Sequence, residues 1–342
     1  MVRVQDVAAA ARVSVGTVSN VLNHPEKVAT ETVDRVQRAI DELGFVRNDA
    51  ARQLRNGLSL SVGLIVPDLR NPFFAEVARG ADRRAREHGL ALMITNSDED
   101  AGRELEHTRL FEQQRVSGVL ASPVADQLGH LSQIRSRGIP VVLVDRVSDD
   151  GSLPAVAVDD VEGGRLAAAH LIGQGRRRLA FVGGAITVRQ IADRLAGAQQ
   201  AVLAAPEATM EVIGTDDLTV MAGRDVGAGL SARPPERRPD AIFAANDLLA
   251  LGLLQALVMD GSISVPGDIA IVGYDDIDFS RSAVVSLSSI RQPAAEMGAT
   301  AIDLLLEQRS QRAPRGVLYR PELVVRDSSR PSAAPGQASR SE

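Results

Sequence analysis

Apolar residues recur at helical spacing near the start of the chain and predict three short helices there. They repeat every three or four positions in residues 4–11, in Val15–Asn23 and again up to Leu43. Ser14 stands where a helix N-cap is expected, and Gly44 suits a left-handed C-terminal cap. We therefore expect three helices that share one small core, with the first two forming a helix-turn-helix.

From residue 60 onward, short apolar runs alternate with longer amphipathic stretches. This alternation predicts parallel sheets with helices on both faces. The expected strands form two Rossmann-like lobes, at residues 61–66, 90–95, 118–121 and 141–144 and at residues 179–182, 210–213, 241–244 and 269–274. A strand at 288–292, a helix at 294–307 and a final strand at 317–325 would connect the lobes. The predicted fold class is an all-α helix-turn-helix headpiece followed by a two-lobed α/β core.

The same patterns divide the chain into domains. The expected parts are a headpiece (1–46), a hinge linker (47–58), a core (59–327) and a tail (328–342) that is disordered by its Ser, Pro, Ala and Gly content. Within the core, lobe one would comprise about 59–160 and 293–318, and lobe two about 161–292 and 319–327.

The linker favours a helix, but its helical stretch at residues 48–55 is short. An isolated helix needs roughly 12 to 15 residues to persist in water. We therefore expect this segment to fold only against a partner. A three-helix module alone is compatible with several roles, so the linker is the feature that favours DNA binding.

Four stretches of the sequence carry a family resemblance. They are residues 6–8 (DVA), 13–23 (VSVGTVSNVLN), 43–45 (LGF) and 51–54 (ARQL). These stretches resemble the headpiece and hinge of the LacI/GalR family of transcription regulators, and the rest of the chain, to about residue 327, resembles the periplasmic-binding-protein-like core of that family. The resemblance implies a repressor that acts as a homodimer on a near-palindromic DNA operator. Arg3 and Arg47 depart from the family pattern, which usually has threonine and proline there.

The resemblance also implies which residues bind DNA. They are Ser14, Val15, Gly16, Thr17, Ser19, Asn20, Asn23, Lys27, Asn48, Ala51 and Leu54. In the major groove, the Asn20 amide can pair with adenine and Val15 can touch a thymine methyl group, whereas Gly16 has no side chain to read a base. In the minor groove, Leu54 would act as an apolar wedge that kinks the duplex. The alternative for Leu54 is an ordinary helix-packing leucine.

A second set of residues is implied to bind an effector between the lobes. They are Asn71, Phe73, Asp145, Arg194, Asn246 and Asp275. Most of them follow predicted strands, and ligands of open α/β sheets bind at the carboxyl ends of strands. Carboxylates, amides and a guanidinium favour a sugar-like or other polar metabolite. The alternative is helix capping, which is left open for Asn246 and Asp247. Phe73, Phe74, Tyr274 and Phe279 are the candidates for stacking on a sugar ring, since the chain contains no tryptophan.

The charge of the chain is unusual for a DNA-binding protein. The net charge is −6, but residues 1–57 hold eight basic and seven acidic groups, so the acidity lies in the rest of the chain. Attraction to DNA must therefore be local, and binding to non-specific DNA should be weak.

Other functions are disfavoured by what the sequence does not contain. There is no cysteine, and the five histidines are scattered, so we expect no metal site and no cofactor. Residues 227–232 match a dinucleotide-binding pattern but lie in a predicted helix, so we expect no enzyme. The acidic residues 97–100 are interpreted as a helix N-terminus rather than a cation site. Gly163 and Gly164 are expected at a tight strand-to-helix connection.

A plain solute-binding protein is the main competing class. Its core would look alike, but it would have no use for residues 1–56 and would need an export signal. The N-terminus begins instead with an amphipathic helix pattern, and no long apolar run follows, so we expect a cytoplasmic protein that does not enter a membrane. The tail offers no heptad helix, so we expect a dimer rather than a larger oligomer.

Overall fold

The computed structural model describes residues 2–45, 59–124, 128–148, 150–184, 188–309 and 315–330. The chain divides into two compact units, Met1–Ser59 and Leu60–Glu342. The hinge residues Asn48, Ala51 and Leu54, and with them the predicted hinge helix, lie outside the described residues. The two units are considered one at a time.

The first unit is the predicted three-helix headpiece. It contains α1 (Val4–Ala10), α2 (Val15–Asn23), the short 3-10 helix η1 (Pro25–Lys27) and α3 (Thr30–Leu43). Its small core is built around Val7, Val18 and Val36, which are fully buried. The predicted caps are confirmed, because the Ser14 hydroxyl accepts a hydrogen bond from the Thr17 amide at 3.0 Å and Gly44 adopts a φ of 62°.

At the start of α1, the residue in the N-cap position does not cap the helix with its side chain. Arg3 occupies the N-cap position, and a guanidinium has no acceptor with which to cap. The Asp6 carboxylate accepts a hydrogen bond from the Arg3 amide at 2.7 Å instead. One half of a capping box is therefore present, supplied from inside the helix.

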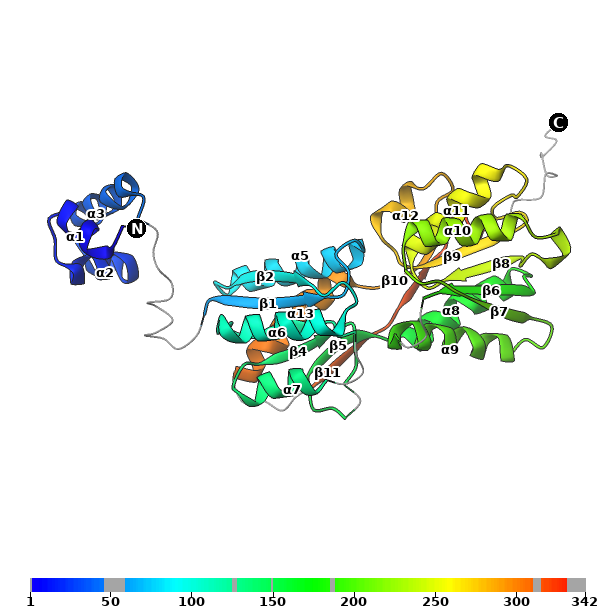
Figure 1. Cartoon of the computed structure of the whole chain (residues 1–342), viewed down its shortest axis with the longest axis horizontal. Helices are drawn as coiled ribbons and strands as arrows, with labels where there is room; N and C mark the ends of the chain where they lie inside the picture. Colours follow the sequence, from blue (N-terminus) through cyan, green and yellow to red (C-terminus); the bar gives the residue numbers. More distant parts are fainter. Residues whose placement is uncertain are drawn as a thin grey trace, which may run out of the picture. The chain divides into compact units, whose positions relative to one another are not determined.

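Lobe one is a parallel sheet of six strands in the order β11-β5-β4-β3-β1-β2. The strands are β1 (Ser61–Val66), β2 (Ala91–Asn96), β3 (Val119–Ala121), β4 (Val141–Val144), β5 (Ala155–Val158) and β11 (Gly316–Tyr319). One face is covered by α5 (Pro72–Glu87) and α13 (Ala294–Arg309), and the other by α6 (Ala101–Gln113) and α7 (Gly129–Ser136) (Figure 1). The central strands are buried on both faces, as continuous apolar runs require.

Lobe two is a second six-stranded sheet, in the order β12-β10-β9-β8-β6-β7, and only β12 runs antiparallel to its neighbour. The strands are β6 (Arg178–Gly183), β7 (Thr209–Gly214), β8 (Ala241–Ala244), β9 (Ala270–Asp275), β10 (Ser288–Arg291) and β12 (Glu322–Val324). Helices α8 (Asp160–Gly173) and α9 (Arg189–Leu203) lie on one side of the sheet, and α10 (Val220–Ser231) and α11 (Asp247–Asp260) on the other (Figure 1). The short helices η2 (Pro235–Arg237) and α12 (Asp278–Ser282) complete the lobe.

The chain passes between the lobes at three places. It crosses after β5, between β10 and α13, and between β11 and β12. The single final strand predicted at 317–325 was wrong, since the segment forms two strands that belong to different sheets. Pro321, between them, has no amide hydrogen and suits the break. The four-residue strand β5 was not predicted.

The prediction that disorder begins at residue 328 was also wrong. Ser328 and Ser329 are buried, and the Ser328 hydroxyl donates to the Ile271 carbonyl at 2.6 Å and accepts from the Ser288 amide at 2.8 Å. A prediction from composition assumes that serine lies at the surface. The Ser328 hydroxyl is instead hydrogen bonded to backbone groups of β9 and β10 in the lobe two sheet. Residues 331–342 of the predicted tail lie outside the described residues.

Helices α8 and α9 approach each other more closely than side chains would allow. A Cβ atom on Gly164 would lie 1.9 Å from the Arg194 carbonyl oxygen, and one on Gly197 would lie 1.8 Å from the Val161 carbonyl oxygen. The prediction of a strand-to-helix connection at Gly163 and Gly164 was therefore wrong, because both lie inside α8. Gly164 and Gly197 allow α9 to pack against α8, whereas Gly163 lies against the Tyr274 side chain.

Among the described residues, no helix is both long enough and apolar enough to cross a lipid bilayer. The dinucleotide-binding pattern at 227–232 falls largely within α10, as predicted.

Candidate functional site

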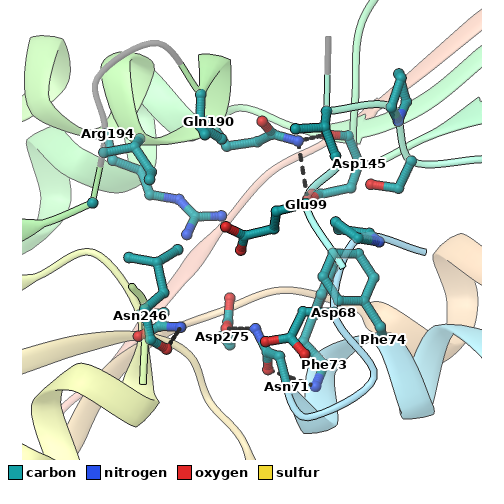
Figure 2. A pocket seen from close by; sticks show the side chains of 18 of the residues that line it. Asp68, Asn71, Phe73, Phe74, Glu99, Asp145, Gln190, Arg194, Asn246 and Asp275 are labelled. Atoms are coloured by element: carbon teal, nitrogen blue, oxygen red, sulfur yellow. Dashed lines mark hydrogen bonds between the residues drawn. The ribbon is translucent and has the colours of Figure 1, made fainter. Parts of the chain in front are cut away.

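A cleft of about 860 Å³, open to solvent, lies at the carboxyl ends of strands from both sheets. The six predicted effector residues, Asn71, Phe73, Asp145, Arg194, Asn246 and Asp275, all line it (Figure 2). The first three come from lobe one and the last three from lobe two. The fold therefore brings together residues that are more than 200 positions apart in the sequence.

Arg194 lies deep in the cleft, on α9, and is held by three groups of lobe two. Its Nε donates to the Asp160 carboxylate at 2.8 Å, its Nη1 donates to the Ala245 carbonyl at 2.7 Å, and its guanidinium carbon lies 3.7 Å from the centre of the Tyr274 ring. Burial alone would lower the pKa of Arg194, but Asp160 and the other nearby acidic groups raise it further above its ordinary value. Arg194 is thus a fixed cation.

Asp275 and Asn71 join the two lobes across the cleft. The Asn71 amide nitrogen donates to Asp275 Oδ2 at 3.0 Å, and its carbonyl oxygen accepts from the Phe73 amide at 3.0 Å, which caps α5. Asp275 Oδ1 accepts from Gln292 at 2.8 Å. Burial raises the pKa of Asp275, and Arg194 opposes that shift. Asp275 also has a φ of 109°, a strained backbone conformation that aims its side chain.

Asp145 faces the cleft from the end of β4. Its Oδ2 and its backbone carbonyl accept hydrogen bonds from Gln190 of α9, at 3.3 Å and 2.5 Å. Its Oδ1 is buried and has no hydrogen-bond partner among the described residues. Burial, followed by the nearby Asp160, raises the pKa of Asp145 well above its ordinary value. The site therefore holds an acceptor that a ligand hydroxyl can satisfy.

Asn246 and Asp247 prove to have different surroundings. Asn246 lines the cleft and also caps α11, since its carbonyl oxygen accepts from the Leu249 amide at 2.9 Å. Asp247 is fully buried and accepts from the Ile277 amide and from the hydroxyls of Ser280 and Ser289. Asp247 is thus part of the lobe two interior.

Several cleft residues escaped the sequence analysis. They include Glu99, Gln190 and Asp216. Phe73 and Phe74 form an edge-to-face pair with ring centres 5.0 Å apart, and they are the two aromatic residues at the cleft among the four considered for stacking. The sequence could have indicated Glu99 as a cleft residue, because the acidic run at 97–100 directly follows a strand and ligands bind at the carboxyl ends of strands. Within that run, Asp100 caps α6 by accepting from the Arg103 amide at 2.8 Å, as the helix interpretation predicted.

The candidate DNA-binding residues lie on and around α2. Val15, Gly16 and Asn20 are exposed, whereas Val18 and Val21 on the opposite face are buried. The Ser14 and Thr17 hydroxyls are hydrogen bonded to each other at 2.9 Å, and the Asn23 amide donates to the Ser19 carbonyl at 2.8 Å. Lys27 is exposed on η1.

Within the parts of the chain that the structure describes, no group of three or more metal-binding side chains lies together.

Comparison with known proteins identifies the domains. Residues 3–48 match the model of the lacI family of bacterial regulatory proteins, and residues 168–329 match the periplasmic binding protein-like domain. The ribose operon repressor of Bacillus subtilis is 36% identical over 306 residues, which cover 90% of this chain and 91% of that protein. The repressor PurR of Aliivibrio fischeri is 32% identical over 337 residues, which cover 96% of this chain and 98% of that protein.

Two solved structures are similar along nearly the whole chain. The complex of the regulator CelR with cellobiose has a TM-score of 0.70 and 30% identity, and the match covers 96% of this chain and 100% of that one. The lac repressor dimer bound to operator and the anti-inducer ONPF has a TM-score of 0.82 and 26% identity, with 96% and 99% covered.

A helix-turn-helix unit joined to a two-lobed core with a polar cleft defines the class of DNA-binding transcription regulators. The chain belongs to the LacI family of these bacterial regulatory proteins.

Proposed function

We propose that this regulator is a repressor that binds operator DNA as a homodimer, and that a sugar-like metabolite bound between the lobes controls this binding. The observation that supports this effector is the cleft itself, where amides, carboxylates and one guanidinium from the two lobes converge. Such groups bind hydroxyls in fixed directions. The relatives named ribose operon repressor and the similar structures with bound cellobiose and ribose support a sugar.

The effector residues of this proposal are Asn71, Phe73, Asp145, Arg194, Asn246 and Asp275. A ligand that bonds to residues of both lobes favours their closure, and closure is coupled to DNA binding, so effector and operator change each other's affinity by the same factor. Titration calorimetry of the full chain against pentoses, hexoses and disaccharides tests the proposal. At least one sugar should bind, and the Asn246→Ala variant should bind it more weakly. If no sugar of the panel bound at millimolar concentration, the proposal would be wrong.

For operator binding, we propose that α2 reads the major groove. Asn20 would pair with adenine, Val15 would touch a thymine methyl group, and the other headpiece residues, Ser14, Gly16, Thr17, Ser19, Asn23 and Lys27, would approach the DNA backbone or bases nearby. Their support is the exposed outer face of α2. The proposed contact surface is completed in the minor groove by three residues of the hinge at 47–58, namely Asn48, Ala51 and Leu54.

A gel shift with DNA from upstream of the gene tests this surface. Asn20→Ala should weaken specific binding about 5-fold to 150-fold, the range expected for loss of one good base contact. Gln37→Ala is a matched control, because Gln37 is an exposed amide on α3. If Asn20→Ala and Gln37→Ala bound operator equally well, α2 would not be the reading helix.

We propose that two copies meet through an apolar face of lobe two. Large apolar side chains stay exposed there, with 73% of Met259, 60% of Phe279 and 90% of Val284 accessible to solvent. They border a groove between α11 and α12. A contiguous exposed apolar patch of this kind marks an interface more often than chance exposure.

Sedimentation of the full chain measures the assembly directly. Wild type should sediment as a dimer, and Phe279→Asp should shift it toward monomer. Leu203→Asp is the matched control, since Leu203 is 83% exposed at the end of α9, away from this groove. A dimer that survives Phe279→Asp would place the interface elsewhere.

Because such a regulator acts where the chromosome lies, we propose that the protein works in the cytoplasm.

A further inference from the structure

Acidic side chains outnumber basic ones in the cleft. Among the described residues that line it, five are carboxylic acids (Asp68, Glu99, Asp145, Asp216 and Asp275), and Arg194 is the one cation. The charge of Arg194 is already matched by Asp160, which lies behind it and is bonded to its Nε at 2.8 Å. Asp68 is likewise paired with Arg70 at 2.9 Å. Among the residues that the structure describes, the other four carboxylic acids of the cleft form no ion pair of their own.

The buried end of the cleft offers acceptors for hydrogen bonds. Asp145 is only 5% exposed, and its Oδ1 has no partner among the residues that the structure describes. An uncharged ligand with hydroxyl groups can donate to this oxygen, whereas a phosphate or carboxylate oxygen cannot. A ligand anion placed here would also meet the field of Asp275.

At two helix N-termini of the cleft, those of α5 and α11, a protein side chain already bonds one amide, whereas α9, which also begins at the cleft, has no side-chain cap at Val188. Helices α5 and α11 begin at the cleft, and free amide groups at such ends commonly bind phosphate. Here Asn71 accepts from the Phe73 amide at 3.0 Å, and Asn246 accepts from the Leu249 amide at 2.9 Å. In α5 and α11, a protein side chain thus already bonds one of the amides that a phosphate could use.

Glu99 is an exposed residue of lobe one that lines the cleft. The loop after β2 turns sharply, with φ values of 57° at Asp98 and 58° at Glu99, and so directs neighbouring acids to different sides. Asp98 pairs with Arg103 at 2.7 Å, whereas the Glu99 carboxylate points into the cavity toward Arg194 (Figure 2). Burial, followed by the proximity of Asp68, raises the pKa of Glu99.

From this arrangement we infer that the cleft selects an uncharged polyhydroxylated effector over its phosphate ester, and that Glu99 is a specificity-determining residue for this choice. The inference rests on the proposed function, because it concerns the same cleft. Glu99 accepts from a hydroxyl of an uncharged sugar and repels the negative charge of a phosphorylated one.

The test compares an uncharged sugar with its phosphate ester by titration calorimetry of the full chain at low ionic strength. D-Ribose and D-ribose 5-phosphate are the first pair of probes, and the sugar that binds best in the panel gives the second pair. At alkaline pH, where the acids of the cleft are ionised, wild type should bind the phosphate at least about 100-fold more weakly than the sugar, because several carboxylates act together. In Glu99→Gln, the ratio of the dissociation constants of the phosphate and the sugar should fall about tenfold. The reason is that one carboxylate is neutralised at nearly constant side-chain shape.

Asp98→Asn is the matched control for Glu99→Gln. It removes the same charge from the adjacent residue of the same turn, but Asp98 does not line the cleft. The ratio should stay at the wild-type value in this variant. In Glu99→Gln, the phosphate should gain affinity while the sugar changes little or weakens.

The possible outcomes separate the inference from the proposed function. Equal binding of sugar and phosphate by wild type would overturn the inference and leave the proposed function intact. A phosphate that is rejected equally by wild type and Glu99→Gln would show rejection by size, and would overturn the role of Glu99. A chain that binds no uncharged sugar of the panel would overturn the proposed function itself.

Discussion

The two walls of the cleft differ in how their polar groups are satisfied. On the lobe two wall, Arg194 and Asp275 are held by hydrogen bonds to neighbouring protein groups. On the lobe one wall, Asp145 keeps a buried oxygen without a partner among the described residues, and Glu99 points into the cleft toward Arg194. The polar groups of lobe two are therefore fixed in position by the protein itself, whereas those of lobe one still have hydrogen-bond acceptors available for a ligand. Removing Arg194 from the lobe two wall should therefore destabilise the protein, whereas removing the carboxylate of Asp145 from the lobe one wall should stabilise it.

The largest effect is expected from Arg194→Ala. This change leaves the buried Asp160 carboxylate without its cation, and breaking a buried ion pair on one side lowers the free energy of unfolding by about 3–5 kcal/mol. Urea unfolding of the core measures it. Arg189→Ala is the control, because its pair with Asp193 on the same helix is exposed and should contribute less than about 1 kcal/mol. Similar losses in both variants would show that the buried pair of Arg194 supports the fold no more than an exposed pair does.

The second effect is a pH dependence of lobe two. Burial, followed by the nearby Asp275, raises the pKa of Asp247 to about 8. The folded protein then binds more protons than the unfolded chain between the ordinary carboxyl pKa of 3.8 and about 8. The free energy of unfolding should therefore fall as pH rises through this window, by up to about 1.4 kcal/mol per pH unit for this group.

Asp247→Asn tests this dependence, because an amide does not titrate. Urea unfolding at pH 5, 6, 7 and 8 should show a shallower decline in the variant than in wild type. Part of the decline should remain, since burial also raises the pKa values of Asp145, Asp160 and Asp275. Identical slopes in the two proteins would exclude Asp247 as a contributor.

On the lobe one wall, Asp145→Asn should stabilise the protein. The substitution removes a buried carboxylate that lacks a full set of partners, and asparagine tolerates the φ of 58° at this position. We expect a gain of about 1 kcal/mol in the free energy of unfolding and about tenfold weaker sugar binding. Parallel urea unfolding and calorimetry measure the two quantities. A loss of stability would contradict the proposed contrast.

The smallest effect is expected from Asn71→Ser, which tests the contact between the walls. Serine keeps an oxygen that can cap α5, but it loses the amide that donates to Asp275 across the cleft. Stability should drop by less than about 1 kcal/mol, and sugar affinity should change a few-fold. Asn71→Ala, which loses the cap as well, should be about 1 kcal/mol less stable than Asn71→Ser. Equal stability of the two variants would show that the cap contributes nothing.

Local patterns were sufficient to predict the regular parts of the fold. The bounds of α2 follow from its apolar spacing and from Ser14, and β1, β4 and β8 have the predicted bounds because each is a continuous apolar run. The six predicted effector residues do line one cleft. Their individual roles in binding remain predictions.

The features that the sequence did not reveal depend on distant neighbours. Whether 317–325 forms one strand or two is decided by which sheet each half joins. The burial of Ser328 depends on Ile271 and Ser288, which lie far away in the sequence. Glu99 resembled Asp98 and Asp100, and only the turn of the chain separates their directions.

The path of the chain has a consequence for how the protein is made. Both sheets take an edge strand from the same short region, β11 in one lobe and β12 in the other. A nascent chain that leaves the ribosome can therefore complete the sheet of lobe one only after residue 319, and that of lobe two only after residue 324, has been synthesised. The headpiece is free to fold earlier, during translation, whereas the two halves of the core must be finished together at the end.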